Sequence, residues 1–422
     1  MKRKILTRLF LSGLWLSAVL GILLCVPAQS SLFWEADVSR GTSVFGSLER
    51  APGNISVTTD PLGLYGDVYR YDTWDDSSFA KERCESKGTR RADGTSFRVS
   101  LGGTYYLGWR EMWNPMPTNG SWVAFFQMHG YGPPGQGAPL VLRCINGDGN
   151  LYLQNNVNGT DVNFWQTPYR TGEWQTFVLH VHMAIDDTGW VELWHNGTRQ
   201  TFINGQTRYS CPTWDNKDGS YNEFKWGVYR SGSLNGSGDA STFMSRARIA
   251  DTYAEADPND YYKIVDRNSG KVPAVQSASL DNGAPVILWS FGSAQNDQWQ
   301  FVPTDSGYYR LLNRKSGKSL AVEGASTADG ARVIQWSFGS AQNDQWKPIP
   351  IGGGYYNLQN RHSGLMLDVK GASTTNGTQF QQYHSNGGLN QQFQLTPLSS
   401  EAEVLRYNAG HENRYQICRA LN

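Results

Sequence analysis

Apolar and polar residues alternate along most of the chain, and this alternation predicts strands rather than helices. In residues 172–200, GEWQTFVLHVHMAIDDTGWVELWHNGTRQ, two alternating runs flank an Asp-Asp-Thr-Gly turn, and an Asn-Gly turn follows. A period of two residues sends successive side chains to opposite faces of a strand, and such turns are typical of hairpins. Similar strands recur across residues 31–255. They predict a sandwich of two sheets.

The last third of the chain is a threefold repeat. WSFGSAQNDQW begins at position 289 and again at 336, while YYKIVDRNSGK, YYRLLNRKSGK and YYNLQNRHSGL begin at 261, 308 and 355. The period of 47 residues is too short for each unit to bury a core alone, so the three units must share one. We therefore predict an all-β protein, with a β-trefoil over residues 260–397 after a linker around 254–260.

The two ends of the chain follow neither pattern. Basic MKRK and the apolar run that ends near Ala28 are typical of a cleaved export signal, so we expect residues 1–28 to be removed and the protein to be secreted. No second apolar run is long enough to cross a bilayer. The tail, residues 398–422, has no role that we can assign.

The composition of the chain limits the classes of partner and ligand that we expect. Aromatic residues at 13% and 46 glycines suit a turn-rich β protein, and the formal net charge is zero. Without a global field we expect neither nucleic acid nor a membrane as partner, and we expect a monomer. His180 and His182 share a strand face but have no third ligand at a suggestive spacing, so we predict no metal and no cofactor, with calcium left open.

Four cysteines follow the signal, and all are far apart in sequence. They are Cys84, Cys144, Cys211 and Cys418. This dispersion does not suit a zinc site, and exported proteins use disulfides, so we expect one or two bridges whose pairing stays open.

Three segments carry polar residues where strands should be apolar: YYLGWREMWN from 105, WVAFFQMHG from 122 and FKWGVYRS from 224. In the second, alternation places Trp122, Ala124, Phe126 and Met128 on one face and Gln127 and His129 on the other. In the third, Lys225, Gly227 and Tyr229 share one face, and Gly227 would leave room for a ligand. The mixed-sign stretch at 74–91 is interpreted as a solvated loop, and a contribution of Arg90 or Arg91 to an anionic cleft is left open.

These segments resemble the R-x-E-L, Q-I-H and Y-x-K-x-G-x-Y-x-Q motifs of jelly-roll polysaccharide lyases, which include alginate, glucuronan and heparin lyases. The resemblance implies a β-jelly-roll over residues 31–255 that cleaves a uronic-acid polymer by β-elimination. It further implies that Arg110 and Gln127 neutralise the substrate carboxylate, His129 is the base, Tyr229 is the acid, and Lys225 and Arg230 bind substrate.

The third motif departs from the family pattern. Glu223 stands where the leading Tyr would be, and Ser231 replaces the final Gln. The Tyr229-Arg230 ending favours the glucuronan or heparin lyase branch over the true alginate lyases.

The repeat resembles a ricin B-type lectin domain, in which an Asp, an aromatic residue and an Asn-Gln pair bind a sugar in each lobe. The third lobe keeps the whole set: Asp368, Tyr383, Asn390 and Gln391. The first two lobes have Ala274 and Ala321 in place of the Asp, and Asp297 and Asp344 in place of the Gln. We therefore interpret their Trp289 and Trp336 as trefoil packing or weak stacking platforms, and the third lobe as the sugar site.

The leading hypothesis is a secreted lyase for an acidic polysaccharide, held on glycan by its trefoil. The alternative is a non-catalytic double lectin. A third hypothesis, a glycoside hydrolase, lacks a Glu-x-Asp-x-x-Glu motif in the sequence.

Overall fold

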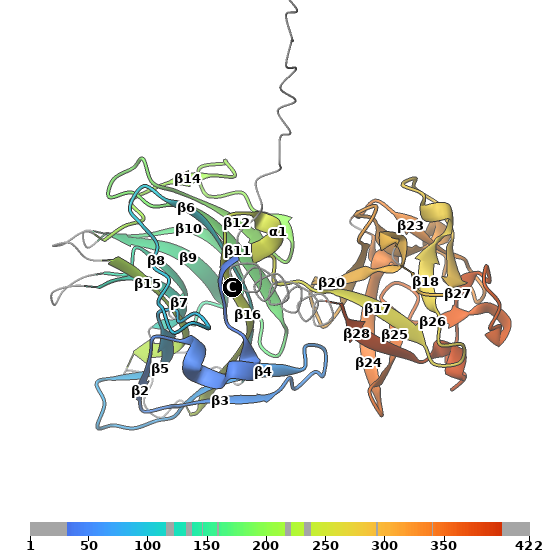
Figure 1. The fold of residues 1–422 in the computed structure, drawn as a ribbon, viewed down its shortest axis with the longest axis horizontal. Coiled ribbons are helices and arrows are strands. Elements are labelled where there is room, and N and C mark those ends of the chain that lie inside the picture. Colours follow the sequence, from blue (N-terminus) through green and yellow to red (C-terminus); the bar gives the residue numbers. More distant parts are fainter. Residues whose placement is uncertain are drawn as a thin grey trace, which may run out of the picture.

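The computed structural model describes residues 32–398, except 115–121, 132–136, 146, 158–159, 216–220, 232–237, 293 and 340. It contains two β domains, a sandwich and a trefoil, which lie next to each other (Figure 1). The all-β architecture predicted from alternation and repeat is confirmed. The export signal, the tail from residue 399 and Cys418 lie outside the described residues, and no helix among those described has the length and apolar character of a membrane span.

The sandwich is a β-jelly-roll of two antiparallel sheets. One sheet has nine strands: β1 (Leu32–Glu35), β3 (Asn54–Thr59), β4 (Asp67–Thr73), β6 (Thr104–Trp113), β11 (Gln175–His182), β12 (Trp190–His195), β13 (Thr198–Arg199), β14 (Tyr209–Ser210) and β16 (Ala240–Ala250). The other has seven: β2 (Ser47–Ala51), β5 (Lys81–Lys87), β7 (Trp122–Tyr131), β8 (Leu140–Ile145), β9 (Asn150–Val157), β10 (Thr160–Pro168) and β15 (Tyr221–Ser231). In the second sheet the spatial order is β10-β9-β8-β7-β15-β5-β2.

Aromatic side chains from both sheets fill the space between them. Trp109 of the nine-stranded sheet stacks on Phe126 of the seven-stranded sheet with ring centroids 4.6 Å apart, and Trp226 stacks on Trp34 at 5.6 Å. All four rings are buried. Because this core uses the inward residues of each strand, the outward residues of the seven-stranded sheet are left to form a polar surface.

A β-bulge in β7 corrects the predicted alternation. The register shifts between Ala124 and Phe126, and Phe125 and Phe126 are both fully buried in the core. Phe126 and Met128 face inward as expected, but Trp122 and Ala124 pack with Tyr229 on the outer face, beside Gln127 and His129. The prediction that Trp122 and Ala124 share a face with Phe126 is therefore wrong.

The trefoil begins after the short helix α1 (Tyr253–Ala256). Its strands are β17 (Tyr261–Asp266), β18 (Val272–Val275), β19 (Val286–Trp289), β20 (Trp299–Pro303), β21 (Tyr309–Asn313), β22 (Ser319–Val322), β23 (Val333–Trp336), β24 (Gln345–Gly352), β25 (Tyr355–Asn360), β26 (Met366–Val369), β27 (Phe380–Tyr383) and β28 (Phe393–Pro397). Short 3-10 helices interrupt them: η3 (Gln276–Ala278), η4 (Gln295–Asp297), η5 (Glu323–Ala325), η6 (Gln342–Asp344), η7 (Lys370–Ala372) and η8 (Leu389–Gln391), while η1 (Val38–Val44) lies in the sandwich. Trp299, Trp346 and Phe393, which occupy equivalent positions in the three repeats, meet in one core.

The trefoil packs against the outer side of the nine-stranded sheet. Tyr262 and Tyr356 donate their hydroxyls to the carbonyls of Leu64 and Gly63, at 3.2 and 2.6 Å. At Gly108 of β6 a Cβ atom would lie 1.9 Å from the Ala256 carbonyl oxygen, so only glycine lets α1 approach this closely. The two domains are therefore joined by specific contacts as well as by the linker.

The described cysteines do not form the expected bridges. Cys84, Cys144 and Cys211 are all free and buried. Burial raises the pKa of the Cys84 and Cys211 thiols to about 12. Among the described residues, therefore, these side chains act as small apolar core residues rather than as disulfide partners.

Candidate functional site

The outer face of the seven-stranded sheet carries a row of polar and charged side chains across four adjacent strands. We call this surface the polar face, and it consists of Glu49, Arg83, Glu85, Lys87, Gln127, His129, Glu223, Lys225 and Tyr229. Strand register sets its layout. Lys225 of β15 lies opposite Gln127 of β7 and Lys87 of β5, and Tyr229 lies opposite Arg83. Three of the four predicted catalytic residues, Gln127, His129 and Tyr229, share this face.

Donors on the polar face converge on carboxylates. Arg83 Nη1 and Lys225 Nζ lie 2.7 and 3.0 Å from the same oxygen, Oε2 of Glu49. Arg83 Nε lies 3.3 Å from Glu85 Oε2, while Gln127 donates its amide to Glu85 Oε1. Glu85 therefore orients both Arg83 and Gln127. Each of the two carboxylates is therefore contacted by Arg83 and by one further donor, Lys225 at Glu49 and Gln127 at Glu85.

His129 presents the nitrogen that a general base needs. Its Nδ1 atom lies 2.5 Å from the carbonyl oxygen of Gly130, which can only accept a hydrogen bond, so Nδ1 carries the proton. The lone pair of the neutral ring is therefore on Nε2. Burial, together with the positive charge of Lys225, lowers the pKa of His129, which favours this neutral form.

Tyr229 is surrounded by cations and an aromatic ring. The guanidinium carbon of Arg83 lies 4.0 Å from the centroid of the Tyr229 ring, and Lys81 Nζ lies 5.7 Å from it. Trp122 packs edge-on against the same ring at 4.8 Å. These contacts hold the phenol at the edge of the polar face, next to Arg83.

Arg110 does not belong to this surface, which corrects its predicted role. It lies on β6 in the opposite sheet, where it is 1% exposed and ion-paired with Asp260 at 2.7 Å. It also donates to the carbonyl of Pro258, and its guanidinium carbon lies 4.0 Å from the ring centroid of Tyr65. Arg110 therefore fastens the linker to the sandwich and cannot reach a substrate bound over Gln127.

The predicted substrate-binding role of Arg230 is also wrong. Since Tyr229 points outward, its neighbour Arg230 points into the sandwich, where it is fully buried and paired with Glu82 and Asp75.

The reason for a glycine at position 227 also differs from the prediction. A Cβ there would lie 2.2 Å from the carbonyl oxygen of Cys84, so the neighbouring strand, not a ligand, requires glycine.

Arg83 is a candidate site residue that the sequence interpretation missed. It belongs to the 74–91 stretch interpreted as a solvated loop, but residues 81–87 form β5, next to β15. A signal was available, because Arg83-Cys84-Glu85 has the R-x-E spacing of the family motif, which Arg110-Glu111-Met112 lacks. On β5 that spacing places Arg83 and Glu85 on the same side of the sheet.

In the third lobe of the trefoil, the four predicted sugar-binding residues lie together. Asp368 is buried, and it accepts hydrogen bonds from Gln381 at 2.9 Å, Asn390 at 2.8 Å and Gln391 at 3.0 Å. Tyr383 is partly exposed beside this network. The carboxylate is thus held by three amides of its own lobe.

The first two lobes of the trefoil each carry a tryptophan that is half-exposed rather than packed in the core. Trp289 and Trp336 are 47% and 48% exposed, so they are not part of the trefoil core, and the packing interpretation is wrong for both. Trp336 lines a cavity of about 530 Å³ together with Asn343 and Asp344. Burial raises the pKa of Asp344 to about 6. An exposed indole beside an amide and a carboxyl group is a suitable surface for a sugar ring.

Comparisons with known proteins agree with this two-domain organisation. Residues 51–248 match the family model "Polysaccharide lyase", and residues 251–336 and 342–412 match "Ricin-type beta-trefoil lectin domain-like". The search of curated proteins gave no match.

Solved structures similar to single domains of the chain were also found. The designed 3-fold symmetric protein ThreeFoil is 50% identical over 33% of this chain and 99% of its own, with a TM-score of 0.33. The endo-beta-1,4-glucuronan lyase from the fungus Trichoderma reesei is 15% identical over 51% of this chain and 94% of its own, with a TM-score of 0.41. The agglutinin of Rhizoctonia solani is 18% identical over 33% and 96%, with a TM-score of 0.31. Because these scores are low, the comparison rests on the family models, which show that the sandwich is similar to a polysaccharide lyase and the trefoil to a ricin-type lectin domain.

Proposed function

We propose that the protein is a secreted lyase that cleaves a uronic-acid-containing polysaccharide by β-elimination on the polar face. The polymer would be of the glucuronan, heparin or alginate kind, and the trefoil would hold the enzyme on glycan. The observation that carries the proposal is the convergence of Arg83, Lys225 and Gln127 on carboxylate oxygens, next to a neutral His129 and to Tyr229.

The chemistry requires three functions, and the polar face has a residue for each. Arg83 and Gln127 neutralise the substrate carboxylate, which makes the proton on the adjacent ring carbon acidic enough to remove. Nε2 of His129 takes that proton, the electron pair forms the ring double bond, and the bond from the neighbouring carbon to the glycosidic oxygen breaks. Tyr229 gives its proton to the departing oxygen.

The spacing of these residues fits a sugar that lies along β7. Tyr229 is opposite Ala124, and His129 is five residues further along the same strand, beyond the bulge. Gln127 lies between them. The base and the acid therefore approach a ring centred over Gln127 from opposite ends, and each side chain covers part of the distance.

The trefoil contributes binding rather than chemistry. The third lobe has the complete Asp368, Tyr383, Asn390 and Gln391 set, and the second has the cavity at Trp336. A module that stays on the polymer raises the effective concentration of substrate at the polar face. Since the trefoil is docked on the sandwich through specific contacts, its sugar sites keep a defined position relative to that face.

The test is the ultraviolet absorbance of the unsaturated uronate that β-elimination leaves. The full chain is incubated with glucuronan, alginate, heparin, hyaluronan and pectate over a range of pH. We expect an absorbance rise with at least one polymer, abolished in His129→Ala and Tyr229→Phe. No rise with any of them would refute the lyase proposal, and new reducing ends without the chromophore would indicate a hydrolase.

Binding measured on the same variants separates the lyase from a double lectin. If His129→Ala and Tyr229→Phe still bind the polymer but do not turn it over, the two residues act in chemistry. If the parent protein binds without turnover and both variants lose binding, the sandwich is a lectin.

A further inference from the structure

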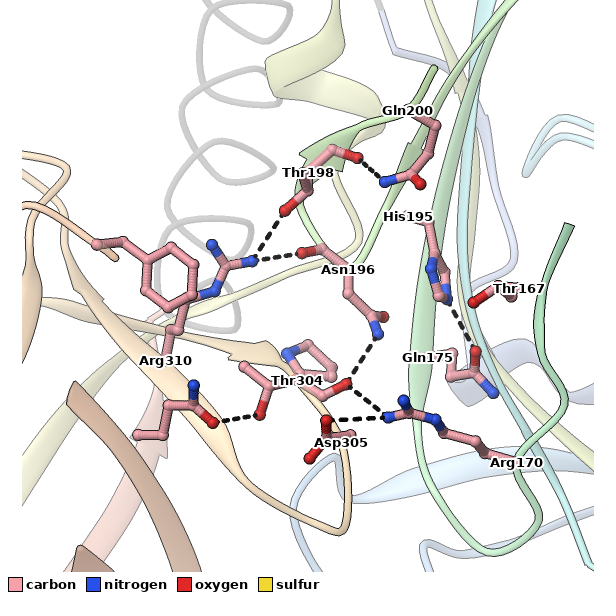
Figure 2. Close-up of a pocket in the computed structure, with 13 residues that line it drawn as sticks. Thr167, Arg170, Gln175, His195, Asn196, Thr198, Gln200, Thr304, Asp305 and Arg310 are labelled. Carbon is pink, nitrogen blue, oxygen red and sulfur yellow. Dashed lines mark hydrogen bonds and ion pairs between the residues drawn. The ribbon is translucent and has the colours of Figure 1, made fainter. Parts of the chain in front are cut away.

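A cavity of about 300 Å³ lies between the two domains, on the side of the sandwich opposite the polar face. From the sandwich its lining includes Arg170, Gln175 and His195, and from the trefoil it includes Thr304 and Arg310 (Figure 2). The volume lies at the lower end of the range for small-molecule sites, which is about 300–1,000 Å³. Neither the motifs in the sequence nor the proposed cleavage site involves this cavity.

Two buried donors at the cavity have no acceptor. Gln175 is 2% exposed and uses Oε1 to bind Nε2 of His195 at 2.8 Å, but its Nε2 atom has no hydrogen-bond partner. Arg310 is 8% exposed, and its Nε atom also has none. Buried N–H groups without acceptors are unfavourable and are rare in folded proteins. The cavity is therefore short of hydrogen-bond acceptors.

The cavity is also short of negative charge. Arg310 donates to the carbonyl of Asn196 at 2.7 Å and to the hydroxyl of Thr198 at 3.2 Å, but no carboxylate among the described residues forms an ion pair with it. Asp305, the acidic residue of the lining, is shared between Arg170 and Arg361. His195 adds no further positive charge, since burial, and to a lesser extent Arg170, lowers its pKa to about 3. Asp344 acts on the Arg310 guanidinium through space but forms no ion-pair contact with it, so a direct anionic partner has to come from outside the chain.

The remaining lining suits a polyhydroxylated ligand. Hydroxyls of Thr198 and Thr304 border the cavity, and Phe338, which is half-exposed, stacks on the Arg310 guanidinium with its centroid 4.0 Å away. Figure 2 shows these polar groups around one space, with Arg310 on the trefoil side and Gln175 and His195 on the sandwich side. An aromatic ring with hydroxyl, amide and guanidinium groups is a combination that recognises a pyranose and its substituents.

We propose that this interdomain cavity is a second binding site, separate from the polar face, for a sugar that carries a carboxylate. The carboxylate accepts from Arg310, and ring hydroxyls accept from the Gln175 amide. The positive charge of the cavity and its buried donors without acceptors indicate a ligand with a carboxylate. That this ligand is an acidic sugar rather than another small carboxylate rests on the proposed function. Because groups from both domains line the cavity, its occupant bridges the sandwich and the trefoil.

The test uses hydrogen-exchange mass spectrometry on the full chain with glucuronate as the probe and glucose as the uncharged control. We expect glucuronate to slow exchange in segments from both domains, around residues 193–200 and 303–310. Arg310→Gln and Gln175→Met should each weaken this protection by about tenfold or more, since each removes a buried donor to the ligand. Arg332→Gln, which changes an exposed trefoil arginine paired with Glu323, is the matched control and should bind like the parent.

Several results would overturn the proposal: no protection in these segments, equal protection by glucose, or unchanged protection in both cavity variants. Gln175→Met leaves the Arg310 contacts between the domains intact, and melting temperatures of all variants establish that they fold. If the exchange experiment gives one of these results but the chromophore assay is positive, the second site is refuted and the lyase proposal stands. If glucuronate protects both segments but no polymer is cleaved, the lyase proposal is refuted and the second site stands.

Discussion

The assignment of Arg83 rather than Arg110 to the substrate carboxylate leads to opposite expectations for two substitutions. In Arg110→Met, a side chain that is 1% exposed and 2.7 Å from Asp260 loses its charge. Burial alone would raise the pKa of Asp260, but Arg110 and Arg246 lower it to about 2, so this carboxylate depends on both arginines. Removing one partner of a buried ion pair costs about 3–5 kcal/mol.

The stability loss in Arg110→Met should lie near the lower end of that range. Arg246 stays within 2.9 Å of Asp260 and keeps part of the compensation. At about 2–4 °C per kcal/mol for a domain of this size, a loss of about 3 kcal/mol lowers the melting temperature by roughly 6–12 °C. Turnover of the folded variant should be close to that of the parent, since Arg110 lies on the sheet away from the polar face.

Arg83→Met should instead lower turnover. The Arg83 side chain is 28% exposed and its pair with Glu49 is partly exposed, but its other partner, Glu85, is only 1% exposed and would keep Gln127 as its hydrogen-bond donor, so we expect a stability loss of about 1–3 kcal/mol. Turnover should fall by about 10²–10³-fold, the usual effect of removing one preorganised group that stabilises developing charge.

Thermal unfolding and the initial rate of chromophore formation, measured on the same preparations, give both quantities. Arg70→Met is the control, because Arg70 is a more exposed arginine of the sandwich paired with Asp72 at 2.8 Å. An Arg110→Met protein that melts like the parent but has lost turnover would refute the assignment. Full turnover in Arg83→Met would refute it equally.

Three further predictions concern pH and sugar binding. Because burial and Lys225 lower the pKa of His129, the acidic limb of the rate profile should lie below pH 6.5, and Lys225→Met should move it to higher pH; an unchanged limb would exclude His129 as the base. Burial raises the pKa of Glu111 to about 8, so the folded state binds its proton more tightly than the unfolded chain does. This contribution to stability is complete below pH about 4.5 and is lost as the pH rises towards 8; Glu111→Gln should therefore unfold at higher urea concentration than the parent at pH 8 but not at pH 4, and equal midpoints at both would contradict this. Trp336→Ala should weaken retention on immobilised polymer by about fivefold or more while leaving turnover of short oligosaccharides unchanged; undiminished retention would remove the second lobe as a sugar site.

The outer face of β15 could be predicted from sequence because its side chains alternate without interruption, although the register of the strand with β7 shifts between Trp226 and Tyr229. Phe224, Trp226 and Val228 face the core, and Lys225 and Tyr229 face out, as simple alternation requires. In β7 the bulge adds a residue that alternation cannot foresee, so Gln127 and His129 were placed correctly but Trp122 was not. A local pattern is reliable as long as no irregularity changes the phase of the strand.

The failure at Arg110 has a different cause. Strand β6 alternates as regularly as β15, and nothing along the chain indicates which of two sheets a strand joins. Arg110 and Arg83 both lie on strands with polar residues, but β6 pairs with β11 and β16, whereas β5 pairs with β15. The same limit applies to the interdomain cavity, since Gln175 and Arg310 are 135 positions apart.

The sequence by itself determined the period of 47 residues and hence the shared trefoil core, the two alternating faces of the sandwich strands, and the positions of Gln127, His129 and Tyr229. These properties depend on residues close together in the chain or on repeated spacing. The tertiary structure decided that Arg83 joins those three, that Arg110 and Arg230 are structural, and that the cysteines among the described residues stay free. Each of these outcomes depends on which strands become neighbours, and strand pairing is set by the packing of the whole core rather than by any single segment.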